Sequence, residues 1–275
     1  MAKSTRSDSR PSHDPTKLGR DFRQKLKRAQ PLLAGSVMEY VRPSLVKLYK
    51  QAGFDFIYLE NEHTTLLTPQ LSDFILAARD NGLPVVAKTS QLDRGEITRL
   101  LDAGVVGIQL PRTESRGDLT TLIDLMKYPP VGTRAAAPCL GNVDYVSPQD
   151  SAQWLKKANR ATLVVAHIET SRGYDNAEQI VSTKGVDMVY VGPFDLSIYL
   201  GHPGDADHPK VNHPMIEILE LCKKHKVAFG TSASSPKTGR QWIKRGCQFF
   251  EMDDEMTFIA SAASEAIAAY RQVER

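Results

Sequence analysis

Two carboxylates, Glu169 and Asp195, follow the ends of two apolar runs in this 275-residue chain. The runs, Thr162–Ile168 and Asp187–Val191, have the length and composition of buried strands. Carboxylates at the ends of buried strands are costly unless they bind something. Two such oxygen donors make a hard site of the kind that Mg²⁺ or Mn²⁺ prefers, and such a metal can act as a Lewis acid on a 2-oxo acid. The alternative interpretation is that both acids only cap the helices that follow them.

Two further residues, His63 and Lys88, could take part in proton transfer or substrate binding. His63 follows the run Phe54–Leu59 and an acidic pair. An imidazole pKa of about 6.5 suits a general base, although a loop histidine can equally be a polar surface group. Lys88 could hold a substrate carboxylate, form a Schiff base, or pair with a strand-end acid. The residues alone leave these roles open.

The elements that must position these residues form a repeating pattern from about residue 31 onward. Eight strand-then-helix units match an α/β fold of the (β/α)₈ TIM-barrel type, in which functional side chains gather at the carboxyl ends of the strands. A doubly wound sheet is the rival, but the chain has no glycine-rich phosphate loop. We interpret the long segment Arg134–Gln153 as a functional loop over the barrel mouth. The predicted strands are Leu32–Met38, Phe54–Leu59, Pro84–Thr89, Val105–Pro111, Thr162–Ile168, Asp187–Val191, Val227–Thr231 and Phe249–Met252.

The first 30 residues differ in composition from the rest of the chain. They hold nine Lys and Arg residues against three Asp residues, with almost no large apolar residue before Leu18. We interpret residues 1–30 as a basic, flexible arm that leads into a first helix, and residues 31–275 as a single barrel domain. The arm lacks the apolar core of a secretory signal, whereas organelle targeting and nucleic-acid binding are alternative interpretations. Because the aromatic residues show no alternation with basic ones, we expect no nucleic-acid partner.

Composition points to an ordinary globular protein. Hydrophobic residues make up 41% and charged residues 24% of the chain. No apolar run approaches the length of about 18 residues that crosses a membrane, so no membrane partner is expected. The three cysteines, Cys139, Cys222 and Cys247, are odd in number and widely spaced. This usage favours a reducing compartment, and we expect a cytoplasmic protein.

The strand-end motifs together resemble the HpcH/HpaI aldolase family of metal-dependent pyruvate aldolases. The resemblance runs from about residue 32 to the end of the chain and rests most on the combination IET, GPxDLS and LG within residues 167–201. Each short motif alone would be weak evidence. The other matching stretches are FDFIYLENEH (54–63), PVVAKTSQLDRGEITRLLDAGVVGIQLPRTES (84–115), YPPVGTR (128–134) and GTSASSP (230–236).

The resemblance implies a TIM barrel in which Glu169 and Asp195 ligate Mg²⁺, Mn²⁺ or Co²⁺. It implies that His63 is the base, acting through a water, and that Asp102 orients its imidazole. It also implies a homo-oligomer, a hexamer or another trimer-based assembly, in which the last helix packs on a neighbouring subunit. The pyruvyl group would be bound near three residues of the matching motifs: His167, Gly192 and Pro193.

Three positions depart from the family pattern, and they concern the substrate more than the metal. Lys88 stands where the family usually has an arginine that clamps the pyruvyl carboxylate, and it keeps the charge but loses the bidentate fork. Glu60 replaces an aspartate, and His167 occupies a position that is usually glutamine-like. We therefore predict a divalent-metal-dependent lyase that cleaves, and reversibly forms, a C–C bond of a 4-hydroxy-2-oxo acid, giving pyruvate and an aldehyde. The alternatives are oxaloacetate decarboxylation or another pyruvate-enolate reaction at the same site, Schiff-base chemistry on Lys88, and a non-catalytic binding protein.

Overall fold

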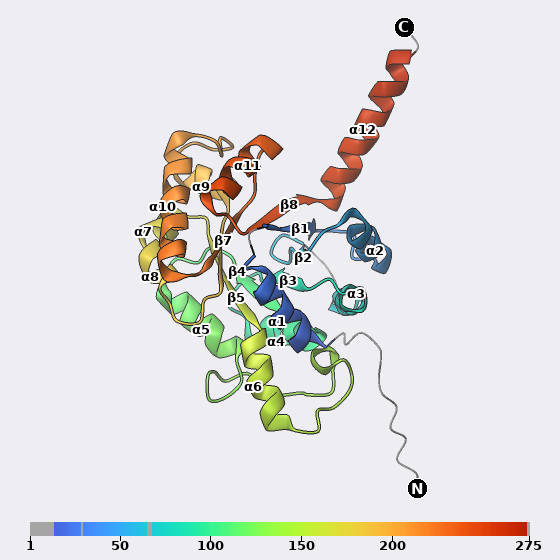
Figure 1. Cartoon of the computed structure of the whole chain (residues 1–275), viewed down its shortest axis with the longest axis vertical. Coiled ribbons are helices and arrows are strands. Elements are labelled where there is room, and N and C mark those ends of the chain that lie inside the picture. Colours follow the sequence, from blue (N-terminus) through green and yellow to red (C-terminus); the bar gives the residue numbers. More distant parts are fainter. Residues whose placement is uncertain (1–13, 29, 65–67, 274–275) are drawn as a thin grey trace.

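Eight parallel strands close into a barrel in sequence order in a computed structural model of the chain (Figure 1), which describes residues 14–28, 30–64 and 68–273. All eight predicted strands are present, and the TIM-barrel prediction is confirmed. Neighbouring strands pair in parallel register, and β8 returns to β1 to close the sheet. The strands are β1 (Leu32–Val37), β2 (Phe56–Leu59), β3 (Val85–Lys88), β4 (Gly107–Leu110), β5 (Leu163–Ile168), β6 (Met188–Val191), β7 (Ala228–Thr231) and β8 (Phe249–Asp254).

Helices surround the barrel, and their ends carry the expected capping residues. Ser115 forms a capping box at the start of one helix, and Gly104 ends another in the left-handed region with φ 110°. No helix in the described part of the chain is long and apolar enough to cross a membrane. The helices are α1 (Pro15–Lys25), α2 (Pro43–Ala52), α3 (Thr68–Asp80), α4 (Arg94–Ala103), α5 (Arg116–Met126), η1 (Gly141–Val143), α6 (Ser151–Ala161), α7 (Ser171–Asp175), α8 (Ala177–Val181), α9 (Pro193–Tyr199), α10 (Pro209–His225), α11 (Pro236–Arg245) and α12 (Glu255–Val273).

Helix α1 closes the amino-terminal end of the barrel. Phe22 is buried, and its ring centroid lies 4.9 Å from that of Phe56, at the start of β2. Gly19 packs so closely on α6 that an added Cβ would stand 2.5 Å from a carbonyl oxygen there. The prediction of a flexible arm over residues 1–30 is therefore wrong for residues 15–25, because their apolar face packs on the barrel. Residues 1–13 lie outside the described residues.

The long segment Arg134–Gln153 lies at the amino-terminal end of the barrel, so the prediction of a loop over the mouth is wrong. The segment connects α5 to α6 and β5, and a connection from a helix to the next strand runs at the end where that strand starts. Arg79, which is 1% exposed, ties it to α3 through Asp144 and the Gly141 carbonyl oxygen. This loop therefore cannot shape the mouth of its own barrel.

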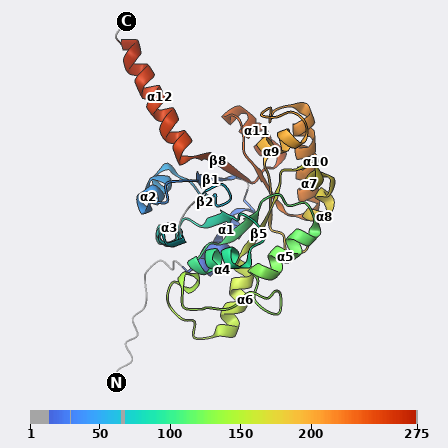
Figure 2. The same cartoon turned by 180° about the vertical axis from the view of Figure 1, so that it is seen from behind.

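Helix α12 projects away from the barrel in both views (Figures 1 and 2). Its first turn is anchored, because the buried Glu255 carboxylate accepts hydrogen bonds from the backbone N–H groups of residues 38, 39 and 40. Phe258 packs near Tyr49 and Phe54, with ring centroids 6.5 and 6.0 Å away. Residues 259–272 are all exposed, including Ile259, at 58%, and Tyr270, at 80%.

Candidate active site

The two predicted metal ligands lie at the carboxyl ends of adjacent strands. Glu169 directly follows β5 and is 4% exposed, whereas Asp195 lies in the first turn of α9, just beyond β6, and is exposed. Burial raises the pKa of Glu169 to about 7, and the negative charges of Asp195 and Glu62 add to that rise against the opposing effects of Lys88 and the Arg112 N–H. A buried carboxylate and an exposed one on neighbouring strands form a hard oxygen donor set that fits a divalent cation.

Closely packed residues join these acids to the predicted pyruvyl site. A Cβ added to Gly192 would meet His167 Nε2 at 2.5 Å and Glu169 Oε2 at 3.4 Å. Glycine is required here because of the lack of space, since the residue has an ordinary φ of −81°. Pro193 starts α9 directly afterwards and is buried. The structure thus brings together Glu169, His167, Gly192 and Pro193, with Asp195 on the same short helix.

His167 is buried beside Glu169 and Gly192 in this site. Burial, and then the charge of Lys88, lower its pKa well below the usual histidine range. Its Nδ1 lies 3.4 Å from the side-chain nitrogen of Gln109. Its Nε2 lies 3.0 Å from Glu169 Oε2 and has no hydrogen-bond partner among the described residues. A buried nitrogen of this kind is able to bind an oxygen of a small ligand.

Lys88 is buried at the end of β3 between two glutamates. Its Nζ lies 2.5 Å from Glu62 Oε2 and 3.3 Å from Glu60 Oε2. Burial alone lowers the pKa of Lys88, but Glu60, Glu62 and Glu169 outweigh it and the pKa is raised above its usual value. A permanently charged ammonium is a poor nucleophile, so this arrangement opposes Schiff-base chemistry on Lys88.

His63 lies at the rim, in the loop after β2. Its side chain is 63% exposed, and its Nε2 lies 3.6 Å from Glu62 Oε2. Glu60, Glu62 and His63 have ligand atoms within 4.8 Å of one another, but the Lys88 ammonium already neutralises part of this group. Our prediction for this segment did not include Glu62 among the site residues, although Glu62 contacts both Lys88 and His63. The acidic residues that precede His63 in the sequence could have indicated its role.

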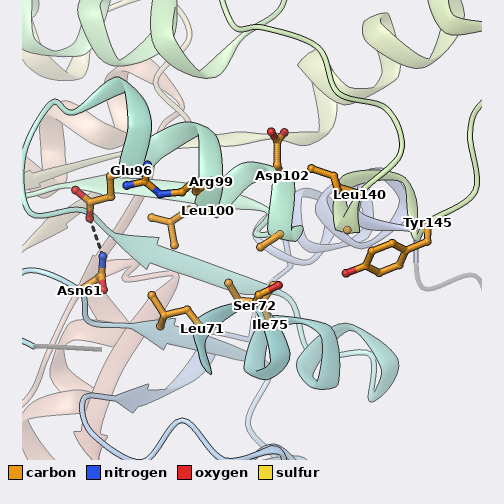
Figure 3. Close-up of a pocket in the computed structure, with 12 residues that line it drawn as sticks. Asn61, Leu71, Ser72, Ile75, Glu96, Arg99, Leu100, Asp102, Leu140 and Tyr145 are labelled. Carbon is orange, nitrogen blue, oxygen red and sulfur yellow. Dashed lines mark hydrogen bonds between the residues drawn. The ribbon is translucent and has the colours of Figure 1, made fainter. Parts of the chain in front are cut away.

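Asp102 does not meet His63 within the chain. It lies in the last turn of α4, at the amino-terminal end of the barrel, where Arg134 and Asn142 donate hydrogen bonds to its carboxylate at 2.6 and 3.0 Å. Figure 3 shows Asp102 beside Leu140 and Tyr145, in a cavity of about 280 Å³ between α3, α4 and the long loop. Asn61 and Glu96 lie at the other end of that cavity and are joined by a hydrogen bond of 2.7 Å.

A polar cluster inside the barrel was not predicted. Glu251, on β8, is 6% exposed, and its Oε2 lies 3.4 Å from the side-chain nitrogen of Gln109. Burial raises the pKa of Glu251 well above its usual range, against the opposing effects of the Gln109 hydrogen bond and of Lys88. The only indication of this cluster in the sequence was an acidic residue among the aromatic and apolar residues of FFEM. That pattern indicates that Glu251 is buried, but it does not indicate which residues Glu251 contacts.

Comparison with known proteins identifies the family. Residues 38–261 match the model of the HpcH/HpaI aldolase/citrate lyase family. The chain belongs to this family. The HpcH/HpaI chain is 27% identical over 254 residues to hydroxypyruvate/pyruvate aldolase of Delftia acidovorans, covering 92% of this chain and 93% of that protein. It is 30% identical to 5-keto-4-deoxy-D-glucarate aldolase of Klebsiella pneumoniae, covering 80% and 85%.

Solved structures agree with this assignment. The HpcH/HpaI aldolase from Desulfitobacterium hafniense superposes with a TM-score of 0.85 at 25% identity, covering 90% of this chain and 95% of that one. The predicted family membership is therefore confirmed, and the HpcH/HpaI chain is a carbon–carbon lyase of the aldolase type.

Proposed function

We propose that this lyase uses a divalent cation, Mg²⁺, Mn²⁺ or Co²⁺, to cleave 4-hydroxy-2-oxo acids reversibly into pyruvate and an aldehyde. The proposal rests on the cluster of Glu169, His167 and Gly192, together with Asp195 in the first turn of α9, which directly follows Gly192. Glu169 and Asp195 would hold the cation. When bound, it would supply Lewis-acid stabilisation of the negative charge that develops on the 2-oxo group.

The chain's own residues account for the remaining steps. His167 Nε2 would bind an oxygen of the pyruvyl group beside Gly192, where any side chain would crowd that nitrogen. Lys88 would add positive charge near the carboxylate and the developing enolate. His63, through a water, would take the proton of the 4-hydroxyl group. The C3–C4 bond then breaks, its electron pair stays on C3 as the enolate, C4 becomes the aldehyde carbonyl, and a proton returned to C3 gives pyruvate.

The test separates enolate formation from aldol cleavage. Protein stripped with EDTA is assayed with each metal for exchange of the pyruvate C3 hydrogens in D₂O and for pyruvate release from 4-hydroxy-2-oxo acids and from oxaloacetate. We expect metal to restore both exchange and aldol cleavage. Decarboxylation without cleavage of hydroxy-oxo acids would reject the aldolase, and activity that persists in EDTA would reject the role of the cation.

We also propose that the chain works as a homo-oligomer built through α12. An isolated helix of this length is only marginally stable in water, and residues 259–272 are all exposed with respect to the described part of their own chain. Their apolar and alanine-rich surface suits a neighbouring copy. Because Asp102 and His63 lie at opposite ends of one barrel, an orienting contact between them would have to cross between two copies.

Removing residues 259–275 should therefore lower the oligomeric state, as measured by sedimentation velocity. Ile267→Glu, which places a charge on the exposed apolar side of α12, should act in the same direction. Lys224→Glu, on the exposed surface of α10, is the control and should leave the assembly unchanged. A wild-type chain that sediments as a monomer would contradict the proposal.

A further inference from the structure

Two buried polar residues inside the barrel, Gln109 and Glu251, have no part in the proposed reaction. Gln109 lies on β4 and Glu251 on β8, the strand opposite β4 in the closed order of eight. Both side chains are buried. The interior of a TIM barrel is usually filled by branched apolar side chains, and a polar group buried there costs free energy unless it is hydrogen-bonded. We therefore expect this pair to serve a purpose other than packing.

The pair forms a chain of contacts that leads across the barrel to His167. The side-chain nitrogen of Gln109 lies 3.4 Å from Glu251 Oε2 and 3.4 Å from His167 Nδ1. An amide NH₂ group has two protons, so it can donate one to each of these atoms. Glu251 only has to accept, which a carboxyl group can do through one oxygen whether it is charged or protonated. Glu251 thus favours the orientation in which the amide nitrogen, and not the amide oxygen, faces His167.

The Gln109 nitrogen determines which ring nitrogen of His167 carries the proton. In a neutral imidazole one nitrogen donates and the other accepts. Because Nδ1 faces a donor, it has to accept, and the ring proton then lies on Nε2. The other side of the ring agrees with this assignment, since Nε2 lies 3.0 Å from Glu169 Oε2 and a carboxylate oxygen accepts. The surroundings of both ring nitrogens therefore favour the same tautomer.

Other neighbours hold the His167 ring in place without contacting Nδ1. The Tyr190 ring, on β6, packs against it at 78°, with the ring centroids 4.7 Å apart. The His167 backbone is fixed by Thr113, whose N–H donates to the His167 carbonyl oxygen and whose hydroxyl accepts from the His167 N–H. Among the described residues, Gln109 is the hydrogen-bond partner of Nδ1. The location of the ring and the location of its proton are thus controlled by different residues.

We propose that Gln109 and Glu251 are positioning residues that hold the proton of His167 on Nε2, where the ring donates a hydrogen bond to an oxygen of the pyruvyl group. The carbonyl, carboxylate and enolate oxygens of a 2-oxo acid all accept hydrogen bonds. A ring with its proton on Nδ1 would face them with a lone pair instead. The inference rests on the proposed function, because it adds two residues to the binding of that same pyruvyl group.

The first measurement determines the tautomer of His167 in the full chain without metal or substrate. Nuclear magnetic resonance correlation of ring protons with ring nitrogens, in protein labelled with nitrogen-15, distinguishes a protonated ring nitrogen from an unprotonated one. The signals of His167 are those absent from His167→Gln. We expect a proton on Nε2 and none on Nδ1. A proton on Nδ1, alone or together with one on Nε2, would overturn the proposal, and this result requires no activity.

The second measurement is a double-mutant cycle on the exchange of the pyruvate C3 hydrogens with saturating metal. Gln109→Leu removes the donor to Nδ1 and should lower kcat/KM for pyruvate about tenfold to a hundredfold. In His167→Gln, whose amide has no tautomer to fix, the same change at Gln109 should cost less than about twofold. Glu251→Gln keeps an oxygen that can accept, so it should retain most of the activity that Glu251→Leu loses.

Gln248→Leu is the matched control. The Gln248 amide also makes two hydrogen bonds, to the Leu26 carbonyl oxygen at 2.6 Å and from the Phe229 N–H at 3.3 Å, but it directly precedes β8, at the amino-terminal end of the barrel. This variant should leave the exchange unchanged. A general loss of packing would act equally in both backgrounds, so equal losses from Gln109→Leu with and without His167 would overturn the positioning role. Absence of exchange in the wild-type protein would instead reject the proposed function, and the tautomer would still decide the proposal.

Discussion

Glu169→Gln is expected to abolish turnover, with a loss of kcat/KM of at least about a thousandfold. The substitution keeps the volume of the side chain and one oxygen that can accept the Arg112 N–H, but it removes the anionic donor that a hard cation requires. Asp195→Asn should have a similar effect, because two carboxylates share the charge of one cation. If electrostatic stabilisation of the enolate dominates catalysis, both losses reach several kcal/mol of transition-state stabilisation.

Measurements of metal binding and of thermal unfolding show whether the loss of activity comes from loss of the metal or from loss of the fold. Titration calorimetry with Mn²⁺ should show binding to the wild-type protein and little or none to either variant. Thermal unfolding of Glu169→Gln should be close to wild type, because the change removes a buried charge rather than a packed apolar group. Glu220→Gln, on the exposed surface of α10, is the control for a lost carboxylate. Variants that bind Mn²⁺ as the wild type does would place the metal elsewhere.

The strands could be predicted from the sequence because burial on both faces leaves a continuous apolar run. LVVAHI, in β5, is an example, with every residue buried. The topology rule for parallel barrels then placed the residues after β5 and β6 at one end, and the structure brings Glu169, His167 and Gly192 together there. Local pattern and general topology were sufficient for this part of the site.

Errors arose where the outcome depended on which end of the barrel a segment occupies. The loop after α5 lies at the amino-terminal end, so Arg134–Gln153 does not cover the mouth. The last turn of α4 lies at the same end, so a contact of Asp102 with His63, which stays a prediction, would have to be made between two copies of the chain. We did not predict that helix α1 packs on the barrel, because it has few apolar residues. Its packing is evident only from the structure, in which Gly19 lies against α6 and Phe22 is buried. The sequence offered a strand-end acid as a partner of Lys88, but that both Glu60 and Glu62 contact it depends on distances that no sequence pattern encodes.

Lys88→Met is expected to lower kcat/KM by about a hundredfold or more, and the structure explains why the loss exceeds that of one substrate contact. The ammonium is the only positive side chain that faces Glu60 and Glu62 among the described residues. Its removal leaves two carboxylates close together in a largely buried site, which raises their proton affinity and repels an anionic substrate. The measurement is steady-state cleavage with metal, together with urea unfolding.

A second variant distinguishes the role of Lys88 in binding substrate from its role in separating two acids. The double variant Lys88→Met with Glu62→Gln removes one of the unpaired charges, so it should recover stability relative to Lys88→Met alone but should not recover activity. Lys88→Arg keeps the charge and offers a bidentate fork, and it should retain more kcat/KM than the methionine variant if the side chain contacts the pyruvyl carboxylate. Borohydride reduction in the presence of pyruvate should trap no adduct in the wild-type protein, since the paired ammonium stays charged. Recovery of full activity in the double variant would show that Lys88 only neutralises Glu62 and that the substrate carboxylate is held elsewhere.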